Sequence, residues 1–122
     1  AEGVWSPLNI NVKSDFVGAT VRRFGEEYEK RYKEVPGVIA IANYAAFDVI
    51  TKAMQDARSL DTDKVLAALT QKPFDTVWGK LVLGGKETYG IDRQFLYPMV
   101  ISEIRDGKVV DIAQVLPAAL KK

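Results

Sequence analysis

The 122-residue chain contains neither cysteine nor histidine. Without cysteine, structural disulfides, iron–sulfur clusters and cysteine-ligated zinc are excluded. Without histidine, the Ser-His-Asp and Cys-His arrangements and most catalytic zinc sites are excluded as well. The remaining side chains include no recognisable pair of nucleophile and base. The sequence therefore argues against an enzyme, and no metal or cofactor is expected.

Long apolar runs, clustered charge and an export signal are also missing. No apolar run approaches the roughly 18 residues that a membrane-spanning helix needs. The start, Ala1-Glu2-Gly3, has neither the basic region nor the apolar core of a signal peptide, which a secreted protein would have lost on export. The 17 basic residues are interspersed with 16 acidic ones, whereas binding along phosphates needs clustered basic residues. Nucleic acid is therefore not an expected partner.

The acidic residues and glycines form no recognised site motif. Asp61 and Asp63 lack the central glycine and terminal glutamate of a calcium-binding loop at the required spacing. Asp61 is instead expected to cap a helix. No phosphate-binding pattern links the glycines of the second half, which are expected in turns: Gly79, Gly84, Gly85 and Gly90.

Helical periodicity predicts three helices. The first is expected over residues 15–34, with Ser14 as its N-cap. The second is expected over 43–58 with Asn43 as its N-cap, and the third near 62–71. The apolar run Val38–Ala42, before the second helix, is consistent with a buried strand or a tight extended connection. The second helix is expected to be buried on more than one side, because its apolar residues cover several faces: Tyr44, Ala46, Phe47, Val49, Ile50, Ala53, Met54 and Ala57.

Strands are predicted in the last third of the chain, over 77–83, 95–105 and 108–115. Asp106-Gly107 indicates a two-residue hairpin between the last two, since a type I′ turn needs two residues with positive φ. Pro98 predicts an edge position or a bulge. The length suits one domain, and the order of elements suits an α/β layer with too few βα units for a complete doubly wound fold.

Asn43 and Tyr44 stand where the predicted strand meets the predicted helix. Ligands of open α/β sheets bind beyond the carboxyl ends of strands, and helix N-termini favour anions. A carboxylate-bearing ligand near 39–44 is therefore one interpretation. Helix capping and core packing are the alternative, and these residues alone do not decide between them.

Several segments in order resemble the C-terminal part of type I periplasmic solute-binding proteins, which serve ABC importers for branched-chain amino acids and related carboxylates. The segments are Glu2-Gly-Val-Trp5, the helix carrying Phe24 and Tyr32, Ala42-Asn-Tyr-Ala-Ala46, Val65-Leu-Ala-Ala-Leu69, Phe74-Asp-Thr-Val-Trp-Gly79 and Ile104-Arg-Asp-Gly-Lys-Val109. Together they cover nearly the whole chain, and their order and spacing are more specific than any one of them.

The resemblance implies an α/β fold that is part of a two-lobed periplasmic binding protein, with three helices, a C-terminal β-hairpin and crossover strands, and not a complete domain. Residues 1–8 would form a crossover between the lobes, and residues 9–122 would complete one lobe and return to the hinge. The implied hinge residues are Gly3, Val4, Trp5, Ser6 and Pro7. The N-terminal part of such a protein would be a further partner.

The resemblance also implies a ligand and a route. An apolar wall for an amino acid or small carboxylate would come from Ile39, with Ala42, Asn43 and Tyr44. The family often has an aromatic residue where this chain has Ile39, so a ligand shape other than leucine or valine is open. The segment Tyr89–Phe95 resembles subgroups that take other small carboxylates, including aromatic acids. Lobe closure would trap the ligand in the periplasm, and the closed protein would dock on an inner-membrane permease.

Three alternatives remain open from the sequence. The same lobes serve as ligand-sensing domains of receptors and regulators. A small stand-alone α/β enzyme and an autonomous interaction domain would each require the 122 residues to fold and act alone.

Overall fold

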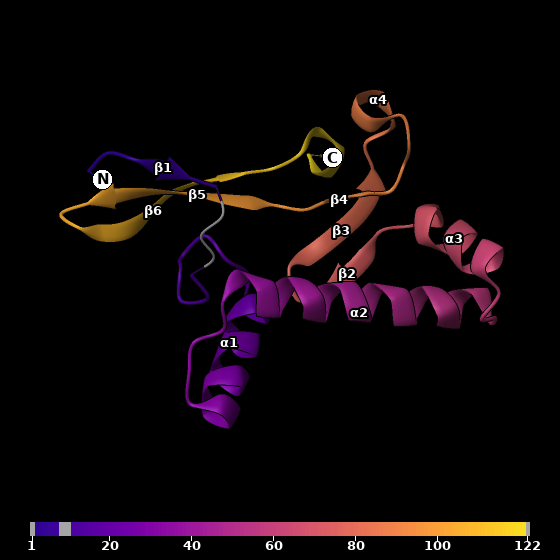
Figure 1. Ribbon diagram of the computed structural model, residues 1–122, viewed down its shortest axis with the longest axis horizontal. Coiled ribbons are helices and arrows are strands. Elements are labelled where there is room, and N and C mark those ends of the chain that lie inside the picture. The colour runs from indigo at the N-terminus through magenta and orange to yellow at the C-terminus, as the bar shows by residue number, and fades with distance from the viewer. Residues whose placement is uncertain (1, 8–10, 122) are drawn as a thin grey trace.

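The computed structural model describes residues 2–7 and 11–121, and Figure 1 shows two small sheets above a long helix. The helices are α1 (Ala19–Tyr32), α2 (Val38–Ala57), α3 (Thr62–Gln71) and α4 (Lys86–Tyr89), with a 3-10 turn η1 (Ala118–Leu120). The strands are β1 (Trp5–Ser6), β2 (Phe74–Thr76), β3 (Gly79–Gly84), β4 (Gln94–Leu96), β5 (Met99–Arg105) and β6 (Lys108–Val115). The α/β class is confirmed.

The first sheet joins the two ends of the chain. Its three strands lie in the order β1-β5-β6 and are antiparallel. The backbone N–H of Gly3 donates to Ile104 at 2.9 Å, and that of Ile104 donates to Val4 at 3.0 Å. Asp106 and Gly107 have φ of 51° and 70°, so the predicted type I′ hairpin is confirmed. The N-terminal segment and the final hairpin, distant in sequence, thus lie side by side (Figure 1).

The second sheet carries most of the core. Its three antiparallel strands lie in the order β2-β3-β4, with Phe74 opposite Leu81. α2 and α3 pack on it through one apolar cluster: Val49, Ala53, Val65, Ala68, Phe74 and Leu81. A second cluster joins α1 and α2 to the turn after β2: Val12, Val21, Ile41, Ala45 and Val77. α2 therefore contributes to both clusters and holds the molecule together.

Two of the three predicted helices begin elsewhere than expected. α1 starts at Ala19 with Gly18 as its N-cap, whereas Ser14 is buried in a preceding turn and its hydroxyl accepts from the Phe16 N–H at 3.2 Å. α2 starts at Val38 after Gly37, so the predicted strand over 38–42 and the Asn43 cap are wrong. A short apolar run has no periodicity of its own, and the helix that follows extends back through it.

The third helix and the proline behave as the sequence indicates. α3 spans the predicted residues, and the Asp61 carboxylate accepts from the Lys64 N–H at 3.1 Å. The long strand predicted over 95–105 is interrupted at Pro98, because proline cannot donate a ladder hydrogen bond. β4 before the break belongs to the second sheet and β5 after it belongs to the first. The strand predicted over 77–83 starts at Gly79.

Candidate functional site

The N-terminal end of α2 is the centre of the candidate site. Gly37, its N-cap, provides no side-chain hydrogen bond, and the first turn contains no acidic residue. The positive end of the helix dipole is therefore not balanced by a carboxylate from its own first turn. Ile39 is 73% exposed, and both Ala42 and Asn43 are exposed. Both backbone N–H groups and apolar side chains at this end of α2 are thus available to contact a ligand.

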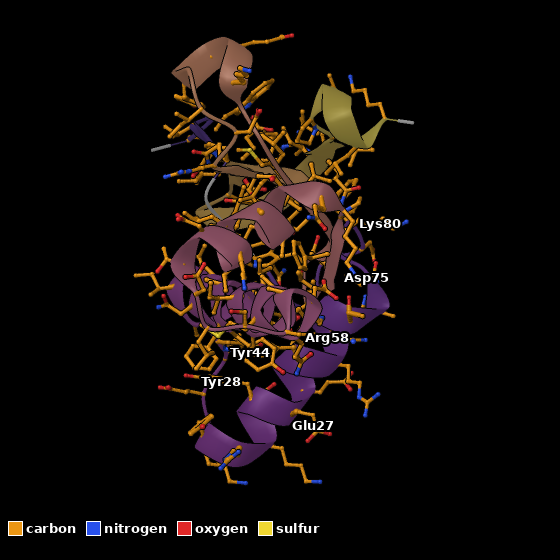
Figure 2. The ribbon with its side chains drawn as sticks, turned by 90° about the vertical axis from the view of Figure 1, so that its right-hand side faces the viewer. Glu27, Tyr28, Tyr44, Arg58, Asp75 and Lys80 are labelled. Atoms are coloured by element: carbon orange, nitrogen blue, oxygen red, sulfur yellow. The ribbon has the colours of Figure 1, made fainter. Side chains whose placement is uncertain are left out.

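The structure brings three of the four predicted wall residues together. At about 100° per residue, Ile39, Ala42 and Asn43 share one face of α2, whereas Tyr44 lies roughly 140° around the helix from Ile39. The ring of Tyr44 packs at 4.9 Å from that of Phe24 in α1. Figure 2 shows Tyr44 close to Tyr28, on the side of α2 that faces α1. Tyr44 therefore belongs to a contact between two helices.

Aromatic rings line that contact. Tyr28 lies with its ring centroid 5.9 Å from Phe24 and 4.6 Å from Tyr32. Desolvation, and next the Glu34 carboxylate 3.3 Å away, raise the pKa of the Tyr28 phenol above its usual value of about 10. The phenol is therefore neutral at physiological pH, and this contact is aromatic rather than charged.

α2 begins next to the N-terminal segment. A cavity of about 40 Å³ lies between Pro7, Val38, Trp78 and Tyr97, and the rings of Trp78 and Tyr97 are 5.1 Å apart. Pro7 belongs to the predicted crossover and Val38 is the first residue of α2. The start of α2, one residue before Ile39, therefore lies near Pro7, in the segment that the sequence resemblance assigns to a hinge.

The predicted hinge residues run along the first sheet. Trp5 and Ser6 pair with Glu103 and Ser102 of β5. Val4 is 51% exposed and Trp5 67% exposed, and Gly3 has φ of +76°, a left-handed conformation that favours glycine. The predicted boundary between residues 8 and 9 lies outside the described residues.

A polar pair inside this sheet was not singled out from the sequence. Ser102 is 1% exposed, and its hydroxyl donates to the Asp111 carboxylate at 2.6 Å. The register shift between Ile101 and Ser102 marks a bulge at this point. The signal was present in the sequence: a two-residue turn at Asp106-Gly107 places residue 102 opposite residue 111.

Replacing Ser102 with alanine is expected to lower the free energy of unfolding by about 1 kcal/mol. The loss is modest because Asp111 is half-buried, so water can replace the hydroxyl. Ser102→Thr, which keeps the hydroxyl, is the matched variant and should lose less. Urea denaturation of both variants measures the effect. Equal losses in the two would contradict a role for the hydrogen bond.

In the described part of the chain, no group of three or more acidic side chains is arranged to hold a metal ion. Among residues 2–7 and 11–121, no helix is both long and apolar enough to cross a membrane.

Solved structures share this fold. An ABC-type branched-chain amino acid transporter from Rhodopseudomonas palustris superposes with a TM-score of 0.75 at 21% identity, over 94% of this chain and 31% of its own. A leucine-binding protein from Thermotoga maritima gives 0.71 at 21%, over 98% and 32%. A solute-binding protein from R. palustris in complex with benzoate gives 0.68 at 20%, over 97% and 32%. The chain thus spans about a third of the length of these structures.

The fold is therefore part of the α/β fold of periplasmic solute-binding proteins. The sequence pattern of the periplasmic binding protein family matches residues 1–108. The chain belongs to the periplasmic binding protein family, and the resemblance seen in its sequence is confirmed.

Proposed function

We propose that this chain is the C-terminal part of a two-lobed periplasmic protein that captures an amino acid or a related small carboxylate and delivers it to an ABC permease. The chain belongs to the periplasmic binding protein family, and the solved structures that share its fold include an ABC-type branched-chain amino acid transporter and a leucine-binding protein. Capture requires a binding wall and a hinge that moves it. The chain offers a candidate for each.

The observation that carries the proposal is the N-terminal end of α2. Free backbone N–H groups at an uncapped helix end favour a carboxylate, and Ile39 with Ala42 offers an apolar surface to the rest of the ligand. Asn43, on the same face, adds an amide that can donate and accept hydrogen bonds. On another side of α2, Tyr44 packs on Phe24 of α1 and so helps to hold α2 in place.

The first sheet supports the hinge role. β1 (Trp5–Ser6) is one strand of that sheet, and Gly3 and Val4 before it hydrogen-bond to Ile104 of the hairpin β5–β6. A second lobe connected through these strands would move when the twist of the strands changes. Such a movement leaves the two apolar clusters of this chain intact. Because α2 begins next to Pro7, movement at the sheet would open or close the space in front of Ile39.

The solved structures that share this fold point to two classes of ligand. One relative is named as a leucine-binding protein, and two others were solved with benzoate and with 3,4-dihydroxybenzoic acid. Both classes have a carboxylate and an apolar body. The short aliphatic side chain of Ile39, where the family often has an aromatic residue, leaves room for a planar ring. We therefore include aromatic acids in the substrate class alongside branched-chain amino acids.

Native mass spectrometry of the protein purified from its source tests the proposal. The expected result is a protein of much larger mass than 13.5 kDa with one small acid bound. Titration calorimetry of the same protein with leucine, valine, benzoate and 3,4-dihydroxybenzoate then identifies the class. A protein that binds none of these acids and carries no small molecule would overturn the proposed function.

The variant Ile39→Asp is expected to weaken binding of the identified acid by at least about tenfold, equivalent to roughly 1.4 kcal/mol. The added carboxylate repels the anionic ligand and removes the apolar contact. Leu60→Asp is the matched control, because Leu60 is 83% exposed and lies in the loop between α2 and α3. Calorimetry compares the two. Equal affinities would remove Ile39 from the binding wall.

A further inference from the structure

α2 has three different faces. Its buried face carries Ile41, Ala45, Val49 and Ala53, each no more than 3% exposed. A second, charged stripe carries Asp48 and Lys52, which form an ion pair at 2.7 Å. The third face is apolar, as the first is, but it is only partly covered: Ile50 packs against the core cluster of the second sheet, whereas Phe47 is 72% exposed. A helix that is apolar on nearly every side is normally buried inside a larger protein.

The partly covered face is defined by Ala46, Phe47 and Ile50, called here the outer face. At about 100° per residue these three side chains lie within roughly 100° of one another around the helix. Phe47 is 72% exposed, and its neighbours Ala46 and Ile50 are half-buried. From Val38 to Phe47, α2 contains no charged residue. Sequence reasoning expected Phe47 in the core, and in this chain it is not.

The outer face continues into a groove. Ala46 and Ile50 also line an open groove of about 590 Å³, together with side chains of α3 and the second sheet: Leu66, Leu69, Leu83 and Phe95. The charged residues that line the groove, Lys86, Asp92 and Arg93, all lie in the segment between β3 and β4. Helix and groove therefore form one apolar surface bordered by charge. Contiguous apolar surface of this kind marks a site where another protein surface packs.

We infer that the outer face of α2 and this groove pack against the portion of the two-lobed fold that the chain does not span. Two observations support this occupant. The chain covers 31% and 32% of the solved structures that share its fold. The three residues of the outer face are uncharged, and the charged residues of the groove all belong to the segment between β3 and β4, so the partner presents mainly apolar side chains.

This inference does not depend on the ligand. It concerns packing within the fold, and it would hold for a transport protein and for a sensor alike. Ile39 and Asn43 are left out of the outer face because a bound acid could also shield them. A failure of the proposed function and a failure of this packing can therefore be observed separately.

Hydroxyl-radical footprinting with mass spectrometry measures side-chain exposure directly and tests the inference. The protein purified from its source, freed of small molecules by dialysis, is compared with the 122-residue chain, each at several dilutions. Phe47 and Phe74 form a matched pair, because the first is 72% and the second 2% exposed. Leu60, 83% exposed in a loop, reports whether the radical dose is equal in the two samples.

The expected result is that Phe47 reacts readily in the 122-residue chain and becomes as unreactive as Phe74 in the source protein, at every dilution. Leu60 should react equally in both. Phe47 that stays reactive in the source protein would overturn the inference. So would protection that appears in the 122-residue chain and fades on dilution, because the occupant would then be a second copy of the same chain.

Discussion

Replacing Phe74 with alanine is expected to lower the free energy of unfolding by about 3–5 kcal/mol, the largest effect of any substitution proposed for this chain. Phe74 is 2% exposed and lies opposite Leu81 in the second sheet. Its ring fills the space between that sheet, α2 and α3, where Val49 and Val65 also pack. Removing the ring leaves a cavity that surrounding β-branched side chains cannot close.

Phe47→Ala is the matched control, because it removes the same atoms from an exposed position. In the 122-residue chain its effect is expected to stay within about 0.5 kcal/mol. Urea denaturation followed by far-UV circular dichroism compares the two variants with the parent. A loss for Phe74→Ala no larger than that for Phe47→Ala would mean that the core of the second sheet is not packed as described.

The sequence was a good guide at three places where a single residue or turn decides the local structure. Asp61 caps α3 through its carboxylate, and two positive φ angles at Asp106 and Gly107 form the hairpin. Pro98 interrupts the ladder, as its missing N–H requires. These features depend on one residue and its immediate neighbours, so tertiary contacts have little power to change them.

The prediction from local sequence was wrong at the start of α2. Val38 and Ile39 are β-branched, and from the sequence they are typical of a strand. Gly37 nevertheless begins the helix there, and Ile41 then enters the core with 0% exposure. Tertiary packing of Ile41 and Ala45 against Val21 outweighs the weak preference of the preceding residues. The N-cap of the helix therefore lies six residues, or about 1.7 turns, earlier than predicted, at Gly37 and not at Asn43.

This shift changes the candidate site and leaves its location intact. Had α2 begun at Asn43, the free N–H groups would have stood beside Tyr44, and Ile39 would have belonged to a strand. With the helix starting after Gly37, the N–H groups and the exposed side chain of Ile39 are adjacent. Tyr44 moves to the far side, where it contacts Phe24. The sequence indicated the right segment. Only the start and register of the helix show that Ile39, Ala42 and Asn43 share one face, whereas Tyr44 packs on α1.

The exposed Phe47 shows a second limit of sequence reasoning. The pattern of α2 correctly indicated apolar residues on several faces, and such a pattern does not say which partner covers each face. One face is covered by this chain's own sheet and α3. On the outer face, Ile50 packs against the same cluster but Phe47 remains 72% exposed, and this exposure became visible only when the covered faces were known.

Replacing Gly25 with alanine is expected to destabilise the chain, although the same change inside a helix normally stabilises it by about 1 kcal/mol. Gly25 lies in the middle of α1, against Val12. A Cβ at this position would lie 2.6 Å from one methyl carbon and 2.7 Å from the Cβ of Val12. Val12 is 2% exposed, so it has little space to move. Overpacking of about 3 kcal/mol should exceed the helical gain and leave a net loss of roughly 2 kcal/mol.

A double-mutant cycle with Val12→Ala separates this contact from a general effect on α1. Alanine at position 12 removes the two methyl carbons but keeps the Cβ, which stays 2.7 Å from the new Cβ at position 25. The double variant should therefore recover only part of the loss, with a coupling of about 1 kcal/mol. Urea denaturation of the four proteins gives the coupling. A stabilised Gly25→Ala protein would show that Val12 does not hold α1 in the folded chain, and the cluster that joins α1 to α2 would then have to be reassigned.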